Sequence, residues 1–346
     1  MVDVAVIGAA GYAGIEAVRL VLGHPRLQLT MATSAADEGK LVASVYPALV
    51  GATDLAFSAP DAEAIASAAR VALLAVPHTA AMALVPALLE RGVTVIDMSA
   101  DYRLRDASVY EAWYGTPHTS PQLLSEAVFG LPELSRNGLA GARLVACPGC
   151  YPTATVLAAL PALQSGPAVG TRIVVDAKSG VSGAGRSATA GTHFVTVNEA
   201  LAPYKVGNHR HTPEMEQALT AAAGRDLSVI FAPHLVPMTR GLLSTVYIDV
   251  EDNFCTSDAV ELYKGRYHKE PFVHVHEAGT MPSTAEVRGT NRASVGVSVD
   301  ERTNTLVAAC AIDNLGKGAA GQAVQCLNAV LGYPETEGFE RPGPVV

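Results

Sequence analysis

The chain has 346 residues, of which 49% are hydrophobic and 16% are charged, and its formal net charge is -9. This composition excludes a disordered chain, and the length is sufficient for two domains that each have their own core. The negative charge, without any clustered face of Lys and Arg, argues against nucleic acid and against an anionic membrane as partners, and favours a small-molecule substrate.

The cysteines and the N-terminal segment indicate a cytoplasmic protein. Five cysteines stand at positions 147, 150, 255, 310 and 326, an odd number that lacks the spacing of a disulfide framework. The chain starts directly with an apolar strand pattern instead of a basic targeting segment, and no apolar run approaches the roughly 20 residues that a membrane-spanning helix needs. We therefore expect a reducing, cytoplasmic location.

The first 22 residues have the pattern of a dinucleotide-binding unit. A buried-strand run at residues 2–7 leads into a glycine-rich turn, and a helix pattern follows at residues 15–22. Glycines in this position permit a tight turn and a close approach of the backbone, and the helix N-terminus binds the pyrophosphate. The alternative is a glycine-rich turn that only packs. The candidate cofactor-binding residues of the turn are Gly8, Ala10, Gly11, Tyr12, Ala13 and Gly14.

The end of the second predicted strand, residues 27–33, favours NADP over NAD. NAD-preferring enzymes usually place an acidic side chain here, on the 2′-hydroxyl of the adenosine ribose. This chain has Ser34 at that point, and its first carboxylate comes only at Asp37. A 2′-phosphate would not be repelled, so we predict that Ser34 contacts it, with Lys40 in support. The alternative is a loop geometry that brings Asp37 inward.

Apolar runs at residues 71–76 and 93–97, separated by a helix pattern at residues 80–90, continue the alternation of strands and helices. Continuous apolar strands of this kind predict a doubly wound parallel sheet, that is, an N-terminal α/β Rossmann domain. His78 follows the first of these runs, where it either touches the cofactor or is simply hydrogen-bonded in a turn.

Arg103 follows the second of these runs, at the carboxyl edge where open α/β sheets bind their ligands. It is either a clamp for an anionic substrate or a surface ion-pair partner of Asp101 or Asp106.

Cys150 is the candidate nucleophile. An apolar run at residues 143–146 turns through Pro148-Gly149 and delivers Cys150 to the start of a helix pattern. A thiol there faces unpaired N–H groups and the positive end of the helix dipole, which favours the thiolate. Cys147 completes a Cys-x-x-Cys motif. We interpret it as a spectator instead of half of a redox switch, because no thioredoxin-like βαβ unit surrounds it.

Two histidines, His209 and His211, stand just before a helix pattern at residues 213–223, with Glu214 close by. They could supply a base and the group that orients it, or half of a metal site. No complementary Cys or His pair lies at metal spacing elsewhere, so we predict no metal. A hydride carrier, a thiolate and an imidazole together indicate an enzyme that interconverts an aldehyde and an activated acid through a thioester.

The second half of the chain has the pattern of an α+β domain with a mainly antiparallel sheet. Few helix patterns separate its strand patterns, and a glycine-rich loop at residues 178–186 is long enough to lie over a cofactor. We therefore divide the chain into an NADP-binding Rossmann domain, residues 1–148, and a catalytic and oligomerisation domain, residues 149–313. A C-terminal helical segment at residues 314–346, whose helix pattern covers residues 319–331, returns to the first domain and brings Asn314 near the reactive end of the cofactor.

These motifs together resemble the N-acetyl-γ-glutamyl-phosphate reductase family, the arginine-biosynthesis branch of the aspartate-semialdehyde dehydrogenase superfamily. The Pro-Gly-Cys-Tyr-Pro-Thr string followed by the histidine string is specific to this branch, whereas aspartate-semialdehyde dehydrogenases carry an asparagine after the cysteine. The segments that carry the resemblance are residues 8–14, 101–104, 148–153, 178–186, 209–214 and 313–323.

The resemblance implies an NADP-dependent oxidoreductase that reduces N-acetyl-γ-glutamyl phosphate to the semialdehyde and phosphate, through a thioester on Cys150. It implies that His209 is the acid/base for the hemithioacetal oxygen, supported by His211 and Glu214, and spacing leaves open which histidine moves the proton. It also suggests a homodimer or homotetramer built through the sheet of the second domain. The other implied contacts are Ser179, Gly180 and Asn314 on the nicotinamide, and Arg103 and Tyr204 on the substrate.

Other functions remain as alternatives. The nearest are an aspartate-semialdehyde dehydrogenase and a reductase of a carrier-bound glutamyl or aminoadipyl phosphate, although the net charge of -9 does not favour docking of an acidic carrier. A cysteine acyltransferase or hydrolase would use Cys150 and His209 but would leave the dinucleotide turn without a role. A non-catalytic NADP-binding regulator would leave the thiolate without one.

Overall fold

The computed structural model describes residues 1–164, 166–340 and 343, and it divides into two compact units. The first unit comprises Met1–Pro148 and the segment that begins at Ala319, and the second comprises Gly149–Gly318.

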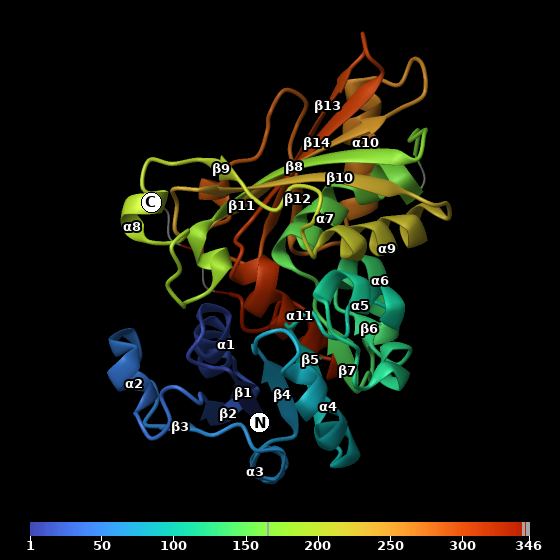
Figure 1. Ribbon diagram of the computed structural model, residues 1–346. Coiled ribbons are helices and arrows are strands. Elements are labelled where there is room, and N and C mark those ends of the chain that lie inside the picture. Colours follow the sequence, from blue (N-terminus) through green and yellow to red (C-terminus); the bar gives the residue numbers. More distant parts are fainter. Residues whose placement is uncertain (165, 341–342, 344–346) are drawn as a thin grey trace. The chain divides into compact units, whose positions relative to one another are not determined.

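The first unit contains a seven-stranded sheet in the order β3-β2-β1-β4-β5-β7-β6 (Figure 1). Every neighbouring pair of strands is parallel, so the predicted doubly wound parallel sheet is confirmed. The strands are β1 (Val2–Ile7), β2 (Leu27–Thr33), β3 (Phe57–Ser58), β4 (Val71–Leu74), β5 (Thr94–Asp97), β6 (Val128–Phe129) and β7 (Leu144–Ala146).

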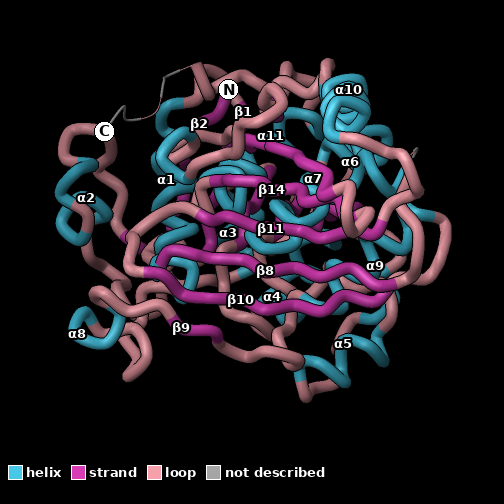
Figure 2. The backbone as a smooth tube through the Cα atoms, turned by 90° about the horizontal axis from the view of Figure 1, so that it is seen from above, coloured by secondary structure: helices cyan, strands magenta, loops and turns pink. Residues whose placement is uncertain are grey.

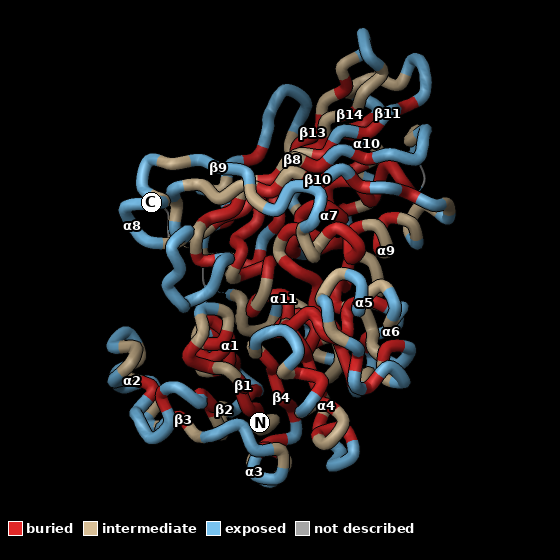
Figure 3. The backbone as a smooth tube through the Cα atoms, in the orientation of Figure 1, coloured by how far each residue is buried: buried red, intermediate tan, exposed pale blue. Residues whose placement is uncertain are grey.

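Both faces of this sheet are buried, which explains why its central strands are apolar without alternation. In β1, Val4 and Val6 belong to one hydrophobic cluster, whereas Ala5 and Ile7 belong to the cluster on the opposite face. Figure 3 shows β1 and β4 as buried strands. The helices of this unit are α1 (Tyr12–Gly23), α2 (Val42–Val45), α3 (Ala62–Ala68), α4 (Ala81–Glu90), α5 (Ala107–Tyr114), α6 (Pro132–Leu139) and α11 (Gly321–Val330).

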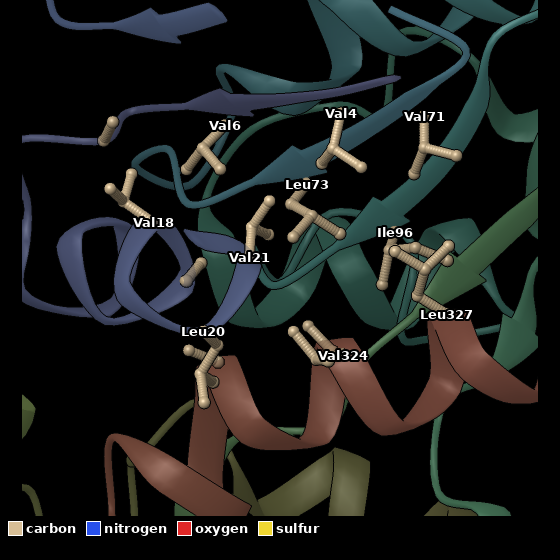
Figure 4. Packing of buried hydrophobic residues seen from close by; sticks show 14 of the residues in the cluster. Val4, Val6, Val18, Leu20, Val21, Val71, Leu73, Ile96, Val324 and Leu327 are labelled. Atoms are coloured by element: carbon tan, nitrogen blue, oxygen red, sulfur yellow. The ribbon is translucent and has the colours of Figure 1, made fainter. Parts of the chain in front are cut away.

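Helices α1 and α11 cover one face of the sheet together. Figure 4 shows Val18 and Val21 of α1 and Val324 and Leu327 of α11 on the same face of the sheet, in one cluster with Leu73 of β4. A helix from the C-terminal end of the chain therefore completes the core of the N-terminal unit.

The C-terminal segment, residues 314–346, contains the helix predicted at residues 319–331. Helix α11 covers most of that range, a π-helical turn at Gly316–Ala320 precedes it, and residues 331–340 are not helical. The helix ends because Gly332 adopts a φ of 71° and Pro334 has no N–H to donate. Residues 341–342 and 344–346 of the C-terminal segment lie outside the described residues.

The second unit contains a mixed seven-stranded sheet in the order β12-β13-β14-β11-β8-β10-β9. Two neighbouring pairs, β8 with β10 and β12 with β13, are parallel, and the others are antiparallel, so the predicted mainly antiparallel sheet is confirmed. The strands are β8 (Arg172–Gly180), β9 (Ala202–Pro203), β10 (Ser228–Val236), β11 (Leu242–Asp249), β12 (Val273–Val275), β13 (Ala293–Asp300) and β14 (Thr305–Ile312).

Helices cover one face of this sheet and leave the other exposed. Helix α7 (Cys150–Gln164) packs on β11 and β14, between α9 (Thr212–Ala223) and α10 (Thr256–Tyr267). A short helix, α8 (Phe194–Val197), precedes β9. Figure 2 looks onto the opposite face, where β10, β8 and β11 cross the view with no helix in front of them. Across the part of the chain that the structure describes, no helix has the length and apolar content to cross a membrane.

Candidate active site

The glycine turn of the first unit lies between β1 and α1, and its shape depends on missing side chains. Gly8 has a φ of 78°, and a Cβ there would overlap the carbonyl of Ala75. A Cβ on Gly14 would overlap the carbonyl of Gly8. Gly11 is the N-cap of α1, and no side chain caps this helix end. The backbone can therefore approach a ligand closely, and the uncapped helix N-terminus fits the pyrophosphate of a dinucleotide.

The segment after β2 contains the residues predicted for the 2′-phosphate. Ser34 donates its N–H to the carbonyl of Ser58 at 3.0 Å, and its hydroxyl accepts the N–H of Asp37 at 3.2 Å. Asp37 is buried, and its carboxylate is paired with Lys40 Nζ at 2.9 Å. The negative charge of Asp37 is therefore balanced by the lysine next to it.

Arg103 is buried, with 8% of its surface exposed. Its Nε donates to the carbonyl of Cys147 at 2.7 Å, and Nη2 donates to the carbonyl of Met98 at 2.8 Å. The guanidinium thus holds the end of the strand that leads to the cysteine turn. Asp106 instead caps α5 through the N–H of Ser108.

Two further residues from the sequence analysis lie in the first unit. His78 is exposed and its ring meets the edge of Tyr114, with centroids 5.5 Å apart. Cys147 is fully buried and hydrogen-bonded to Cys326, and both this bond and burial raise the pKa of the Cys147 thiol well above its ordinary value. A buried thiol with a raised pKa is unreactive.

In the second unit, Cys150 is the first residue of α7, where the sequence pattern predicted a helix start. The residue before it is held from two sides. The N–H of Gly149 donates to Glu214 Oε1 at 2.8 Å, and its carbonyl accepts the Thr153 hydroxyl at 3.0 Å. Glu214 is 1% exposed and belongs to the first turn of α9. A buried carboxylate therefore fixes the turn that presents the cysteine.

Two glycines allow close packing around this cysteine. A Cβ on Gly149 would overlap the imidazole of His211, so this ring lies directly against the turn. A Cβ on Gly318 would lie 2.7 Å from the Cβ of Cys150. The cysteine turn thus has a fixed position between α9 and the π-helical turn.

His209 sits in an aromatic wall near the cysteine turn. Its ring centroid lies 5.2 Å from that of Phe231, 5.5 Å from Tyr204, 5.7 Å from Tyr151 and 4.8 Å from His211. Burial, together with the positive charges of Lys205 and Arg210, lowers the pKa of His209 to about 4. The ring is therefore neutral at physiological pH.

The hydrogen bonding of His209 also fixes its tautomer. Its Nδ1 accepts the backbone N–H of His211 at 3.1 Å, so the proton of the neutral ring resides on Nε2. Nε2–H is then a donor.

Tyr151 and Tyr204 form a hydroxyl chain beside this histidine. Tyr204 donates to the hydroxyl of Tyr151 at 3.3 Å, and Tyr151 donates to the carbonyl of His234 at 3.0 Å. Burial raises the pKa of Tyr204 to about 12 and that of Tyr151 further, so both hydroxyls keep their protons. Sequence reasoning overlooked Tyr151, although it is next to Cys150, and it had no signal for Phe231 on the distant β10.

The glycine-rich loop after β8 is anchored to the segment before β11. Gly180 donates its N–H to the carbonyl of Gly241 at 2.8 Å, and Ser179 is buried beside it. Asn314 accepts the N–H of Gly241 at 2.8 Å through Oδ1 and donates from Nδ2 to the Ser182 hydroxyl at 2.9 Å. Asn314 therefore belongs to the second unit and not to the returning helix, since the chain re-enters the first unit only at Ala319.

An ion pair next to Asn314 was not foreseen from the sequence. Asp313 is fully buried and accepts Arg240 Nε at 2.9 Å and Nη2 at 3.0 Å. Its carboxylate also accepts backbone N–H groups, including that of Gly316 at 2.8 Å. Asp313 thus fixes the base of the turn whose Gly318 touches Cys150. Within the described ranges, no group of three or more His, Cys, Asp or Glu side chains converges as a metal site.

Two family models match the chain along most of its length. Residues 3–142 match the semialdehyde dehydrogenase NAD-binding domain, and residues 150–314 match the semialdehyde dehydrogenase dimerisation domain.

Among solved structures, the chain is similar to aspartate semialdehyde dehydrogenase II of Vibrio cholerae, with a TM-score of 0.73, 17% identity, and coverage of 96% of this chain and 98% of that one. It is also similar to the aspartate semialdehyde dehydrogenase of Candida albicans solved with NADP, with a TM-score of 0.71, 14% identity, and coverage of 95% and 98%. At these identities the likeness shows the shared fold.

Full-length relatives narrow the assignment. The chain is 48% identical over 345 residues to the N-acetyl-γ-glutamyl-phosphate reductase of Symbiobacterium thermophilum, covering 99% of each chain. It is 49% identical over 341 residues to the enzyme of that name from Halorhodospira halophila, covering 98% of each. The chain therefore belongs to the semialdehyde dehydrogenase family and, within it, to the N-acetyl-γ-glutamyl-phosphate reductases.

Proposed function

We propose that this protein reduces N-acetyl-γ-glutamyl phosphate to N-acetylglutamate semialdehyde and phosphate, with NADPH and through a thioester on Cys150. The observation that carries the mechanism is the pairing, in one unit, of Cys150 at the N-terminus of α7 with a neutral His209 whose Nε2 bears the proton.

In the first step the Cys150 thiolate attacks the γ-acyl carbon. The C–S bond forms, the bond between that carbon and the phosphate oxygen breaks, and phosphate leaves. The N-terminus of α7 favours the thiolate and stabilises negative charge that develops on the acyl oxygen. The bond from Gly149 to Glu214 keeps the turn in the geometry that presents the sulfur.

In the second step the thioester is reduced and the aldehyde is released. The bound dinucleotide supplies the hydride. We assign to His209 the role of donating a hydrogen bond from Nε2–H to the oxyanion that forms on the hemithioacetal as hydride adds, and this oxyanion re-forms the C=O bond as the C–S bond breaks. His211 supports this role, because its backbone N–H fixes the His209 tautomer and its ring packs on Gly149. Cys150 leaves as the thiolate, ready for another turnover.

We also propose how the chain recognises its ligands. Ser34 would contact the 2′-phosphate and select NADP over NAD, since Asp37 is buried and neutralised by Lys40. Gly8 and the rest of the glycine turn would bind the pyrophosphate. The proposed remaining contacts are Ser179, Gly180 and Asn314 for the nicotinamide, and Arg103 and Tyr204 for the substrate.

A homodimer built on the exposed face of the second sheet fits the match to a dimerisation domain. Val174 pairs in register with Ile230 on one side and with Tyr247 on the other, and all three side chains are exposed. Such a row of exposed apolar side chains is typical of an interface. We further propose a cytoplasmic location, in keeping with the free cysteines.

The reverse reaction tests the proposed function. Purified protein would be given NADP, phosphate and N-acetylglutamate semialdehyde, and NADPH formation would be followed by absorbance, with aspartate semialdehyde as the competing substrate. We expect selective, phosphate-dependent turnover of the acetylated substrate. Turnover of only aspartate semialdehyde, or turnover without phosphate, would contradict the proposal.

A further inference from the structure

Tyr46 links the segment after β2 to the glycine turn. Its hydroxyl donates to the carbonyl of Ala10 at 2.7 Å, across 36 positions of sequence. Both residues lie in the first unit, and Ala10 is 6% exposed. This tyrosine follows the short helix α2, and no sequence motif points to it.

The bond fixes one particular peptide group of the turn. Because a peptide is planar, the carbonyl of Ala10 and the N–H of Gly11 point in opposite directions. The N–H of Gly11 donates to the carbonyl of Gly8 at 3.1 Å, so this peptide plane is held at both ends. The carbonyl oxygen of Ala10 accepts the Tyr46 hydroxyl at the point where the chain enters α1.

Orientation of this peptide matters for an anionic ligand. A carbonyl oxygen turned toward a pyrophosphate repels it, whereas N–H groups at a helix N-terminus attract it. Helix α1 begins at Tyr12 without a side-chain cap, so its first N–H groups are not taken by a capping side chain. Because the Tyr46 hydroxyl holds the Ala10 carbonyl, the N–H groups at the N-terminus of α1 remain the groups that attract the anionic ligand.

The segment that carries Tyr46 is itself tied to the sheet. The N–H of Val42 donates to the carbonyl of Leu55 at 2.9 Å, and the N–H of Phe57 in β3 donates to the carbonyl of Lys40 at 2.9 Å. These two hydrogen bonds fix the position of the segment that carries Tyr46. This same segment begins with Ser34, the proposed 2′-phosphate contact.

We propose that Tyr46 is a positioning residue for coenzyme binding, which orients the Ala10–Gly11 peptide so that the turn accepts the pyrophosphate. This inference rests on the proposed use of NADPH. It concerns coenzyme affinity and not the chemical step, since Tyr46 belongs to the first unit and the proposed nucleophile and proton donor belong to the second.

The test is Tyr46→Phe, which removes only the hydroxyl. The NADPH dissociation constant would be measured by fluorescence titration without substrate, together with kcat, the KM of each substrate and the melting temperature. We expect the dissociation constant and the KM for NADPH to rise about threefold to tenfold, which corresponds to the loss of one hydrogen bond. The values of kcat and of the KM for the acyl substrate would stay within about twofold, because this hydrogen bond does not take part in the chemical step. Tyr333→Phe is the matched control, a tyrosine of the same unit whose ring lies under Arg26.

An unchanged NADPH dissociation constant in Tyr46→Phe would overturn the inference, and so would a lower melting temperature without a change in that constant. Failure of the proposed function gives a different result. A wild-type protein that binds NADH but not NADPH would refute the coenzyme assignment, and the same comparison of variants with NADH would then decide the role of Tyr46. If the protein acts on a different acyl substrate, the coenzyme titration of the variants still tests the role of Tyr46, because it is done without substrate.

Discussion

The carboxylate of Glu214 accepts a hydrogen bond from the backbone N–H of Gly149 at 2.8 Å, so the first turn of α9 fixes the residue before Cys150. Sequence reasoning assigned Glu214 to the support of a histidine. The structure shows in addition a direct link to the backbone of the cysteine turn, buried from solvent.

This link predicts the effect of Glu214→Gln. The amide oxygen still accepts the bond, but the charge-assisted component is lost, and hydrogen bonds to charged groups are roughly twice as strong as neutral ones. We expect kcat to fall about tenfold, with little change in NADPH affinity. Steady-state kinetics and a coenzyme titration would check this.

Glu216→Gln is the matched control for Glu214. Glu216 belongs to the same helix and its carboxylate accepts the backbone N–H of Val229 at 2.9 Å, on β10 instead of the cysteine turn. The Glu216→Gln change should weaken this hydrogen bond, lower stability slightly and leave kcat unchanged. Equal loss of kcat in both variants would show that Glu214 acts only by stabilising α9.

The lowered pKa of His209 predicts a pH dependence of stability. The ring has a pKa of about 4 in the folded protein and about 6.5 when unfolded, so the unfolded chain binds more protons between these values. The contribution of His209 to stability is therefore complete above pH about 6.5 and is lost as the pH falls toward 4. Melting temperatures of the wild type and His209→Asn should converge over this range. A constant difference between them would contradict the lowered pKa.

Coenzyme preference should respond to Ser34→Asp. A carboxylate at this position would repel a 2′-phosphate, whereas it could accept a hydrogen bond from a 2′-hydroxyl. We expect the ratio of kcat/KM for NADPH to that for NADH to fall by about tenfold or more, the equivalent of about 1.4 kcal/mol. An unchanged ratio would remove Ser34 from the 2′-phosphate site.

Gly318→Ala tests the packing around Cys150. A methyl group at Gly318 would lie 2.7 Å from the Cβ of Cys150, and relief of that overlap must move the cysteine or the π-helical turn. We expect a loss of about 1–3 kcal/mol of stability and a lower kcat. Gly265→Ala is the control, because a methyl group on Gly265 in α10 would have no neighbouring atom within 4 Å, so this change should be neutral or stabilising. Normal kcat in Gly318→Ala would show that the contact does not position the nucleophile.

Local features of the fold could be predicted from the sequence. The strand, glycine turn and helix at the N-terminus are adjacent in the chain, so the residues that define them lie in one short window. The start of α7 at Cys150 is likewise defined by residues that are adjacent in the chain. The apolar strand at residues 71–74 indicated a parallel sheet because both of its faces are buried.

Long-range features could not be read from the sequence. The bonds from Glu214 to Gly149 and from Arg240 to Asp313 join residues that only the tertiary fold brings together. Arg103 was expected at a sheet edge, but its position in the sequence does not reveal that it is buried and bonded to the Cys147 carbonyl. By contrast, the end of α11 could be predicted, since Gly332 and Pro334 are ordinary helix-stop signals.

The thioester itself is the most direct test of the mechanism. Enzyme would be mixed with N-acetyl-γ-glutamyl phosphate in the absence of NADPH, quenched in acid, digested and examined by mass spectrometry, beside Cys150→Ser. We predict an N-acetylglutamyl adduct on the peptide that contains Cys150, and its disappearance when NADPH is added. Cys150→Ser should show neither adduct nor turnover but should still bind NADPH, because a hydroxyl is a far poorer nucleophile at neutral pH. Full turnover by Cys150→Ser, or an adduct on another residue, would contradict the account.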